Sequence, residues 1–198
     1  MAFAVLAFLA GGPAVLGLNE AIRQGVTKER REEHRARRVN LLTHFPSPTE
    51  TSMTLEGKRI VLRNKKLYIE DKIPSSDHPF TGYFLDYPNT KYEGLVSSIT
   101  YDPPIMNWIY VDGDTFEVKY GPKIEAHPHY TGPFDCTRGE RRLIFGGWEG
   151  FSAVQEQDGA WALYFDVLAD GLQKVPGDKL ELVLERREVR GLKGDLYI

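Results

Sequence analysis

The stretch over residues 145–166, FGGWEGFSAVQEQDGAWALYFD, constrains the fold of this chain more than any other. Two runs of β-forming residues flank Asp158-Gly159, a dipeptide suited to a two-residue type I′ turn because both central residues of that turn need φ > 0. This turn places Val154 opposite Leu163. Because side chains alternate along a strand, one core-facing side is expected. That side is predicted to carry Val154, Trp161, Leu163 and Phe165.

Two more hairpins are predicted upstream. Residues 58–70 alternate around Asn64-Lys65, and residues 106–120 alternate around Asp112-Gly113, which places Ile109 opposite Phe116. Further strands are expected over residues 80–87, 94–101, 142–145 and 178–187. The chain is therefore predicted to be mainly β, an antiparallel barrel or sandwich of about nine or ten strands with an N-terminal α-helix. No repeat of fixed period is visible in the sequence.

The N-terminal part differs in composition from the rest. Residues 1–18 contain no charged side chain, and Pro13 suits the first turn of a helix that we expect to continue to Leu42. The prolines and small polar residues that follow predict a linker. The domain prediction is an apolar and basic helical segment over 1–42, a linker over 43–56 and a single β-barrel-like domain over 57–198.

Charge is also distributed unevenly. Residues 1–42 carry seven Lys/Arg and four Asp/Glu, a local charge of +3, whereas the whole chain has a net charge of −3. An apolar end followed by a basic helix leaves three interpretations open. Residues 1–38 could attach to a membrane surface, dock on the chain's own β-domain or on a protein partner, or serve as a targeting segment. No nucleic-acid partner is expected, because acidic residues interleave the basic run Lys28–Arg38.

The chain has one cysteine, Cys136, so it cannot form an internal disulfide. It also lacks an Asn-x-Ser/Thr glycosylation site. Both features favour an intracellular protein, cytoplasmic or membrane-associated. We expect Cys136 to be a small core residue, because no local motif of a thiol enzyme surrounds it.

Several runs resemble a family of uncharacterised proteins common in filamentous fungi. The most specific is the WEGF…YFD hairpin over residues 147–166, followed by the NWIYVD hairpin. Shorter similar runs are GPFD at 132–135, HPFTGYFLDYP at 78–88 and GGPA at 11–14. The resemblance implies one β-domain with an N-terminal helix. It implies no activity and no catalytic residues.

His127 and His129 form the best metal candidate, because two histidines at a spacing of two share one side of a strand. The surrounding Gly-x5-His-x-His is similar to the start of the cupin metal motif, but no histidine follows His129 and no glutamate lies within the next four residues. A site here would need a further ligand such as Asp135. Pro128 favours the other interpretation, a polar loop. No cofactor is predicted.

Two carboxylates are candidate catalytic groups. Glu149 lies between Gly147-Trp148 and Gly150, an apolar setting that suits a general acid, although the glycines equally suit a bulge. Asp166 ends the hairpin. The aromatic residues Trp108, Tyr110, Trp148 and Tyr164 are the candidate ligand-binding residues.

The leading hypothesis is a non-catalytic intracellular binding or interaction module. Its expected partner is a protein or a small ligand, and its N-terminus is expected to contact a membrane surface or a protein. It depends on abundant aromatic β structure without a recognisable catalytic set. The alternative is an enzyme or small-ligand binder with its site in the barrel, with or without a metal ion.

Overall fold

The computed structural model describes residues 33–71, 76–100, 103–137, 139 and 141–189. Contacts between residues divide the chain into two units, Met1–Arg35 and Ala36–Ile198. The β structure belongs to the second unit, which is mainly β as the sequence predicts. The short helices in it are α2 (Glu50–Leu55) and α3 (Lys123–Ala126).

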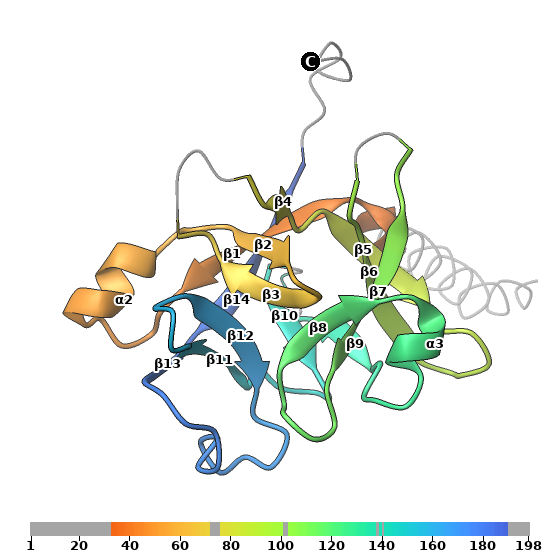
Figure 1. The fold of residues 1–198 in the computed structure, drawn as a ribbon. Helices are drawn as coiled ribbons and strands as arrows, with labels where there is room; N and C mark the ends of the chain where they lie inside the picture. Colours follow the sequence, from red (N-terminus) through yellow and green to blue (C-terminus); the bar gives the residue numbers. More distant parts are fainter. Residues whose placement is uncertain (1–32, 72–75, 101–102, 138, 140, 190–198) are drawn as a thin grey trace, which may run out of the picture. The chain divides into compact units, whose positions relative to one another are not determined.

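Three consecutive lobes make up the β unit, each with an outer pair of strands around a central hairpin (Figure 1). The first lobe, residues 39–86, contains β1 (Val39–His44), β2 (Ile60–Arg63), β3 (Lys66–Ile69), β4 (His78–Pro79) and β5 (Gly82–Asp86). The second lobe, residues 93–136, contains β6 (Glu93–Ser98), β7 (Met106–Val111), β8 (Val118–Gly121) and β9 (Phe134–Cys136). The third lobe, residues 143–188, contains β10 (Leu143–Phe145), β11 (Phe151–Gln155), β12 (Trp161–Phe165), β13 (Lys179–Glu181) and β14 (Val183–Glu188).

The outer strands of the three lobes form a barrel-like ring. β1 pairs with β14 and β5, β5 pairs with β6, and β9 pairs with β10, all antiparallel. The ring is completed by contact between β6 and β9 and by a bridge between Arg142 and Glu185. Closure of this kind leaves few free sheet edges.

The hairpins β2–β3, β7–β8 and β11–β12 meet in a triangle beside the ring (Figure 1). The second strands of the three hairpins, β3, β8 and β12, contact one another in pairs. Lys66 pairs with Lys119 between β3 and β8, and Tyr68 pairs with Ala162 between β3 and β12. Glu117, just before β8, pairs with Tyr164 of β12. We call this arrangement of β3, β8 and β12 the hairpin triangle. It joins the three lobes at one point.

Successive side chains of a strand point to opposite faces, so one face of β3, β8 and β12 lies against the core and the other faces outward. Leu67, Val118 and Leu163 belong to the main core, where each is 1% exposed. Aliphatic and aromatic side chains fill the interior of the ring, so the ring encloses a packed core. The alternative of an enzyme or small-ligand binder with its site in the barrel stays a prediction.

The hairpin over residues 145–166 forms, but its register differs by one residue from the prediction. Ala153 pairs with Leu163, and Val154 pairs with Ala162. The loop has three residues, Gln157 to Gly159, with Gly159 at φ 84°. A shift of one residue changes the face. Val154 therefore leaves the side with Trp161, Leu163 and Phe165, and packs in a second cluster with Tyr164.

The two upstream hairpins also form. Asn64 and Lys65, at φ 49° and 64°, make the predicted two-residue turn. The other loop is longer than predicted, because the Asp112 carboxylate accepts hydrogen bonds from the backbone N–H groups of Asp114 and Thr115. Ile109 therefore pairs with Tyr120, and Phe116 stays in the loop.

The predicted helix to residue 42 is wrong at its end, because residues 39–42 belong to β1 and pair with β14. The predicted linker over 43–56 contains the end of β1 and α2. Thr49 and Ser52 cap α2 reciprocally, each side chain accepting a hydrogen bond from the other's backbone N–H. The expectations for residues 1–32 lie outside the described residues. No helix among the described residues is long and apolar enough to cross a membrane.

Candidate functional site

Three of the candidate residues meet at one depression in the third lobe. Trp148, Glu149 and Asp166 line a cavity of ≈ 310 Å³ between the start of β11 and β13. We call it the Trp148 depression. Its other lining residues are Pro46, Gly150, Phe151, Ser152, Gly171, Lys179, Glu181, Leu182 and Val183.

Trp148 is placed by a tight turn. Gly146 and Gly147 have φ values of 59° and 93°, and Phe145 and Trp148 exchange backbone hydrogen bonds across them. The indole then lies against Gly150, where an added Cβ would be 2.4 Å from Trp148 Cζ2. Its ring meets that of Phe165 edge-on, with the centroids 5.4 Å apart. Trp148 is therefore held in place although it is 42% exposed.

Both candidate carboxylates have partners. Glu149 lies 3.3 Å from the Arg142 guanidinium. Asp166 is buried and accepts hydrogen bonds from the backbone N–H groups of Asp170 (3.1 Å) and Gly171 (2.7 Å). Asp166 thus closes the turn after β12, a structural task that its sequence position did not reveal.

Lys179 and Glu181 also line the depression but were not among the residues predicted from the sequence. Both lie on β13, which pairs with β11 through Ser152 and Glu181. Their alternation with Leu180 indicated only an exposed side. The pairing of β13 with β11 brings both to the depression that Trp148 also lines.

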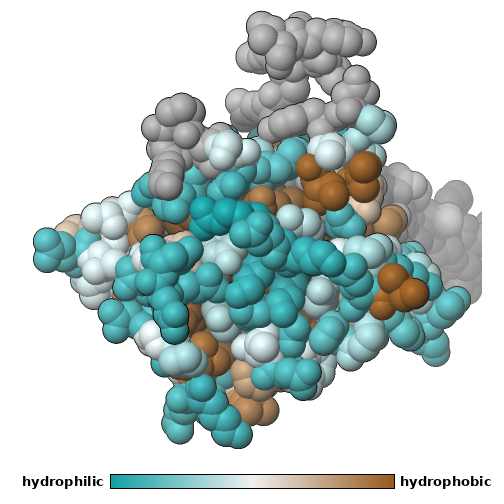
Figure 2. All heavy atoms as spheres, in the orientation of Figure 1, coloured by the Kyte–Doolittle hydropathy of each residue, from teal (hydrophilic) through white to brown (hydrophobic). Residues whose placement is uncertain are grey.

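A second polar group lies on the outer side of the hairpin triangle, and we call it the triangle cluster. Lys66 Nζ lies 2.5 Å from Glu117 Oε1 and 2.8 Å from Glu156 Oε1. Lys119 Nζ lies 2.8 Å from both Asp112 and Glu117. The face over β3, β8 and β12 is mainly hydrophilic (Figure 2).

Two tyrosines complete the triangle cluster. Tyr68 donates to Glu156 (2.9 Å) and Tyr164 donates to Glu117 (3.3 Å). Burial and the neighbouring Glu156 raise the pKa of Tyr68 to about 12. Burial alone would raise the pKa of Glu117, but hydrogen bonds from Lys119, Lys66 and Thr115 outweigh it and lower that pKa. Glu117 therefore stays ionised near neutral pH.

The other candidates lie elsewhere. Trp108 and Tyr110 are on β7 in the second lobe; Trp108 meets Tyr87 edge-on at 4.7 Å, and Tyr110 is buried. His127 and His129 follow α3 and face different rings, Tyr87 and Tyr110, as expected of a loop and not of one side of a strand.

The metal candidates are not brought together. The His129 ring accepts a hydrogen bond from the Gly113 N–H at 3.1 Å, and the Asp135 carboxylate accepts one from the Cys136 N–H at 2.7 Å. No group of three or more His, Cys, Asp or Glu in the described part of the chain is arranged to hold a metal ion. Cys136 is buried in the main core, as predicted.

Comparison with known proteins agrees with the three-lobed architecture. Residues 17–190 match the sequence model of the fungal beta-trefoil domain family. The chain belongs to this family. Searches of curated proteins and of solved structures gave no match.

The trefoil gives the two polar sites their positions. The triangle cluster lies where the three leaves of the trefoil meet, whereas the Trp148 depression belongs to the third leaf. The resemblance to a fungal family is confirmed. The beta-trefoil fold is compatible with a non-catalytic binding or interaction module.

Proposed function

We propose that this beta-trefoil protein is a non-catalytic binding module that takes a hydroxyl-rich ligand, such as a neutral oligosaccharide, in the Trp148 depression. The observation that carries the proposal is the state of Trp148. It is a large aromatic side chain, 42% exposed, yet held by Phe165 and by the bare backbone of Gly150.

The chemistry around the indole suits such a ligand. One face of a sugar ring carries C–H groups that pack on an aromatic ring, while its hydroxyls both donate and accept hydrogen bonds. The depression supplies acceptors on Glu149 and Glu181, a donor on Lys179 and a hydroxyl on Ser152. A mostly apolar wall with a few polar groups is the usual composition of a small-molecule site.

The contacts that Glu149 and Asp166 make within the protein support binding without catalysis. Glycoside hydrolysis uses two carboxyl groups on either side of the bond that breaks. Here Glu149 faces Arg142, and Asp166 is held by two backbone N–H groups of its own turn. Both carboxylates therefore already have partners within the protein.

The partner and location expectations stay predictions. They are an intracellular setting, a protein or small-ligand partner, and a possible membrane surface through residues 1–38. The second unit, which holds the β structure, begins at Ala36. A chain that starts there therefore separates ligand binding by this unit from attachment through residues 1–35.

Isothermal titration tests the proposal. Oligosaccharides of glucose, N-acetylglucosamine and mannose would be titrated into the full chain. We expect saturable binding of at least one class, weakened about tenfold or more by Trp148→Ala, since a central aromatic anchor contributes at least ~1.4 kcal/mol. Tyr130→Ala, which removes an aromatic side chain 46% exposed in the second leaf, is the matched control. Equal affinity for the two variants contradicts the proposal.

A further inference from the structure

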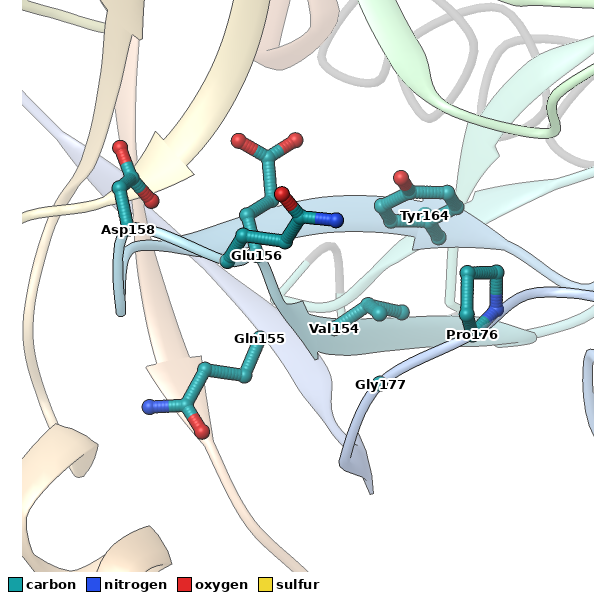
Figure 3. Close-up of a pocket in the computed structure, with 8 residues that line it drawn as sticks. Val154, Gln155, Glu156, Asp158, Tyr164, Pro176 and Gly177 are labelled. Carbon is teal, nitrogen blue, oxygen red and sulfur yellow. The ribbon is translucent and has the colours of Figure 1, made fainter.

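A second depression lies on the outer side of the β11–β12 hairpin (Figure 3). It has a volume of ≈ 570 Å³ and shares no lining residue with the Trp148 depression. Its lining residues are Val154, Gln155, Glu156, Gln157, Asp158, Tyr164, Pro176 and Gly177. We call it the Glu156 depression.

The depression is lined by apolar, aromatic, amide and acidic side chains. Val154, Tyr164 and Pro176 supply an apolar and aromatic wall, and Gly177 adds bare backbone. Gly177 has φ 102°, and an added Cβ would lie 2.5 Å from the Gln155 carbonyl oxygen. In Figure 3 the Glu156 carboxylate and the Tyr164 hydroxyl point to the same side of the hairpin, whereas Gln155 points away.

Among the described residues that line the depression, the charged ones are Glu156 and Asp158. The Lys179 ammonium lies at its edge, 3.4 Å from the Gly177 carbonyl oxygen. Behind them, the triangle cluster has three carboxylates and two ammonium groups, because Lys66 is shared between Glu117 and Glu156. The depression therefore presents an excess of negative charge beside an aromatic ring.

We propose that the Glu156 depression binds an arginine side chain of a partner polypeptide. The guanidinium lies between the Glu156 carboxylate and the Tyr164 ring, with Asp158 at the rim, and its aliphatic stem lies along Val154 and Pro176. A guanidinium is planar, weakly hydrated, and able to stack on a ring while it donates to carboxylates.

Other cations fit less well. A lysine ammonium is compact and strongly hydrated, so it gains less from an aromatic wall. A metal ion would need carboxylate oxygens, but those of Glu156 already accept from Lys66 and Tyr68 at 2.8 and 2.9 Å. An arginine can stack on the Tyr164 ring and donate to the Asp158 carboxylate while Lys66 and Tyr68 keep their bonds to Glu156.

The test uses the ¹⁵N-labelled full chain and acetyl-Gly-Gly-Xaa-Gly-Gly-amide peptides with arginine, lysine, norleucine or glutamate at Xaa. We expect the arginine peptide to shift the amide signals of residues 154–158 and Gly177 saturably, with Kd on the order of 1 mM. We expect weaker shifts from lysine and none from norleucine or glutamate. Higher salt should weaken the binding.

Asp158→Asn is the decisive variant, because asparagine keeps the Oδ1 that accepts from the Ala160 N–H at 3.0 Å but loses the charge. It should weaken the arginine peptide about threefold or more, whereas Glu181→Gln in the Trp148 depression should leave its affinity unchanged. No saturable shift at about 10 mM peptide overturns the proposal. Equal shifts from norleucine and arginine, or unchanged affinity in Asp158→Asn, also overturn it. The sugar titration is independent of all these outcomes.

Discussion

The Tyr164 hydroxyl donates to Glu117 Oε1 at 3.3 Å, across the bridge that joins the third leaf of the trefoil to the second. Glu117 is 8% exposed and also contacts Lys66 of the first leaf. One carboxylate therefore links all three leaves. The outer side of the hairpin triangle is held by ionic groups, whereas its inner side is held by the apolar core.

Tyr164→Phe tests this link with a minimal change. It removes one hydrogen bond to a buried carboxylate that retains its two lysine contacts, so we expect a loss of about 1 kcal/mol in the free energy of unfolding. Urea denaturation measures the loss. Tyr130→Phe, at an exposed tyrosine, should unfold like the natural chain. Equal midpoints for both variants would show that the hydrogen bond contributes nothing.

Neighbouring lysines give a matched pair for the ionic part of the cluster. Lys66 is bonded to two carboxylates, and its side chain is 26% exposed. Lys66→Met leaves both without this partner, and we expect a loss of about 2 kcal/mol, less than for a fully buried pair. Lys65→Met removes an exposed pair with Glu125 and should cost much less. Urea denaturation should give a lower midpoint for Lys66→Met than for Lys65→Met. The opposite order, or equal midpoints, would contradict the role of Lys66.

Acid should weaken the triangle cluster. Hydrogen bonds lower the pKa values of Glu117 and Asp112 against the effect of burial. A lowered pKa means that the stability contributed by each group is complete above the ordinary carboxyl pKa, about 4, and is lost as pH falls through the folded value. Unfolding free energy should therefore be level between about pH 7 and 5 and fall below about pH 4. Glu117→Gln should flatten that fall; an unchanged slope would contradict the assignment.

The membrane expectation for residues 1–38 can be tested with a chain that starts at Ala36. This start keeps β1, whereas a start at the predicted linker would remove the strand that pairs with β14. We expect the full chain to sediment with phosphatidylserine vesicles and the shorter chain to stay in solution. Equal sedimentation of the two would rule out attachment through this segment.

The sequence predicted which segments form hairpins better than it predicted their registers. Asn64-Lys65 was placed correctly, because the two residues fill a two-residue loop with φ > 0. Asp158-Gly159 was misassigned, since a three-residue loop also ends in a glycine at φ > 0 and so carries the same dipeptide. The threefold plan was invisible because the three lobes differ in loop length and in sequence.

The sequence grouped residues that line the Trp148 depression only where they are close along the chain. Trp148 and Glu149 are neighbours, and Asp166 ends the same hairpin, so one local pattern contained all three. Lys179 reaches them through strand pairing across the leaf. The triangle cluster was missed altogether, because Lys66, Glu117 and Glu156 come from three leaves and each looks like an ordinary exposed residue in its own segment.

The binding account is tested most directly by the indole N–H signals of the ¹⁵N-labelled chain, which has 3 tryptophans. Titration with the neutral oligosaccharide panel should shift the Trp148 indole signal saturably and leave those of Trp108 and Trp161 in place. Gly150→Ala, which would put a Cβ 2.4 Å from the indole, should abolish the shift, whereas Gly113→Ala, with its nearest atom 3.8 Å away, should preserve it. A Trp148 signal that no oligosaccharide moves would contradict the account.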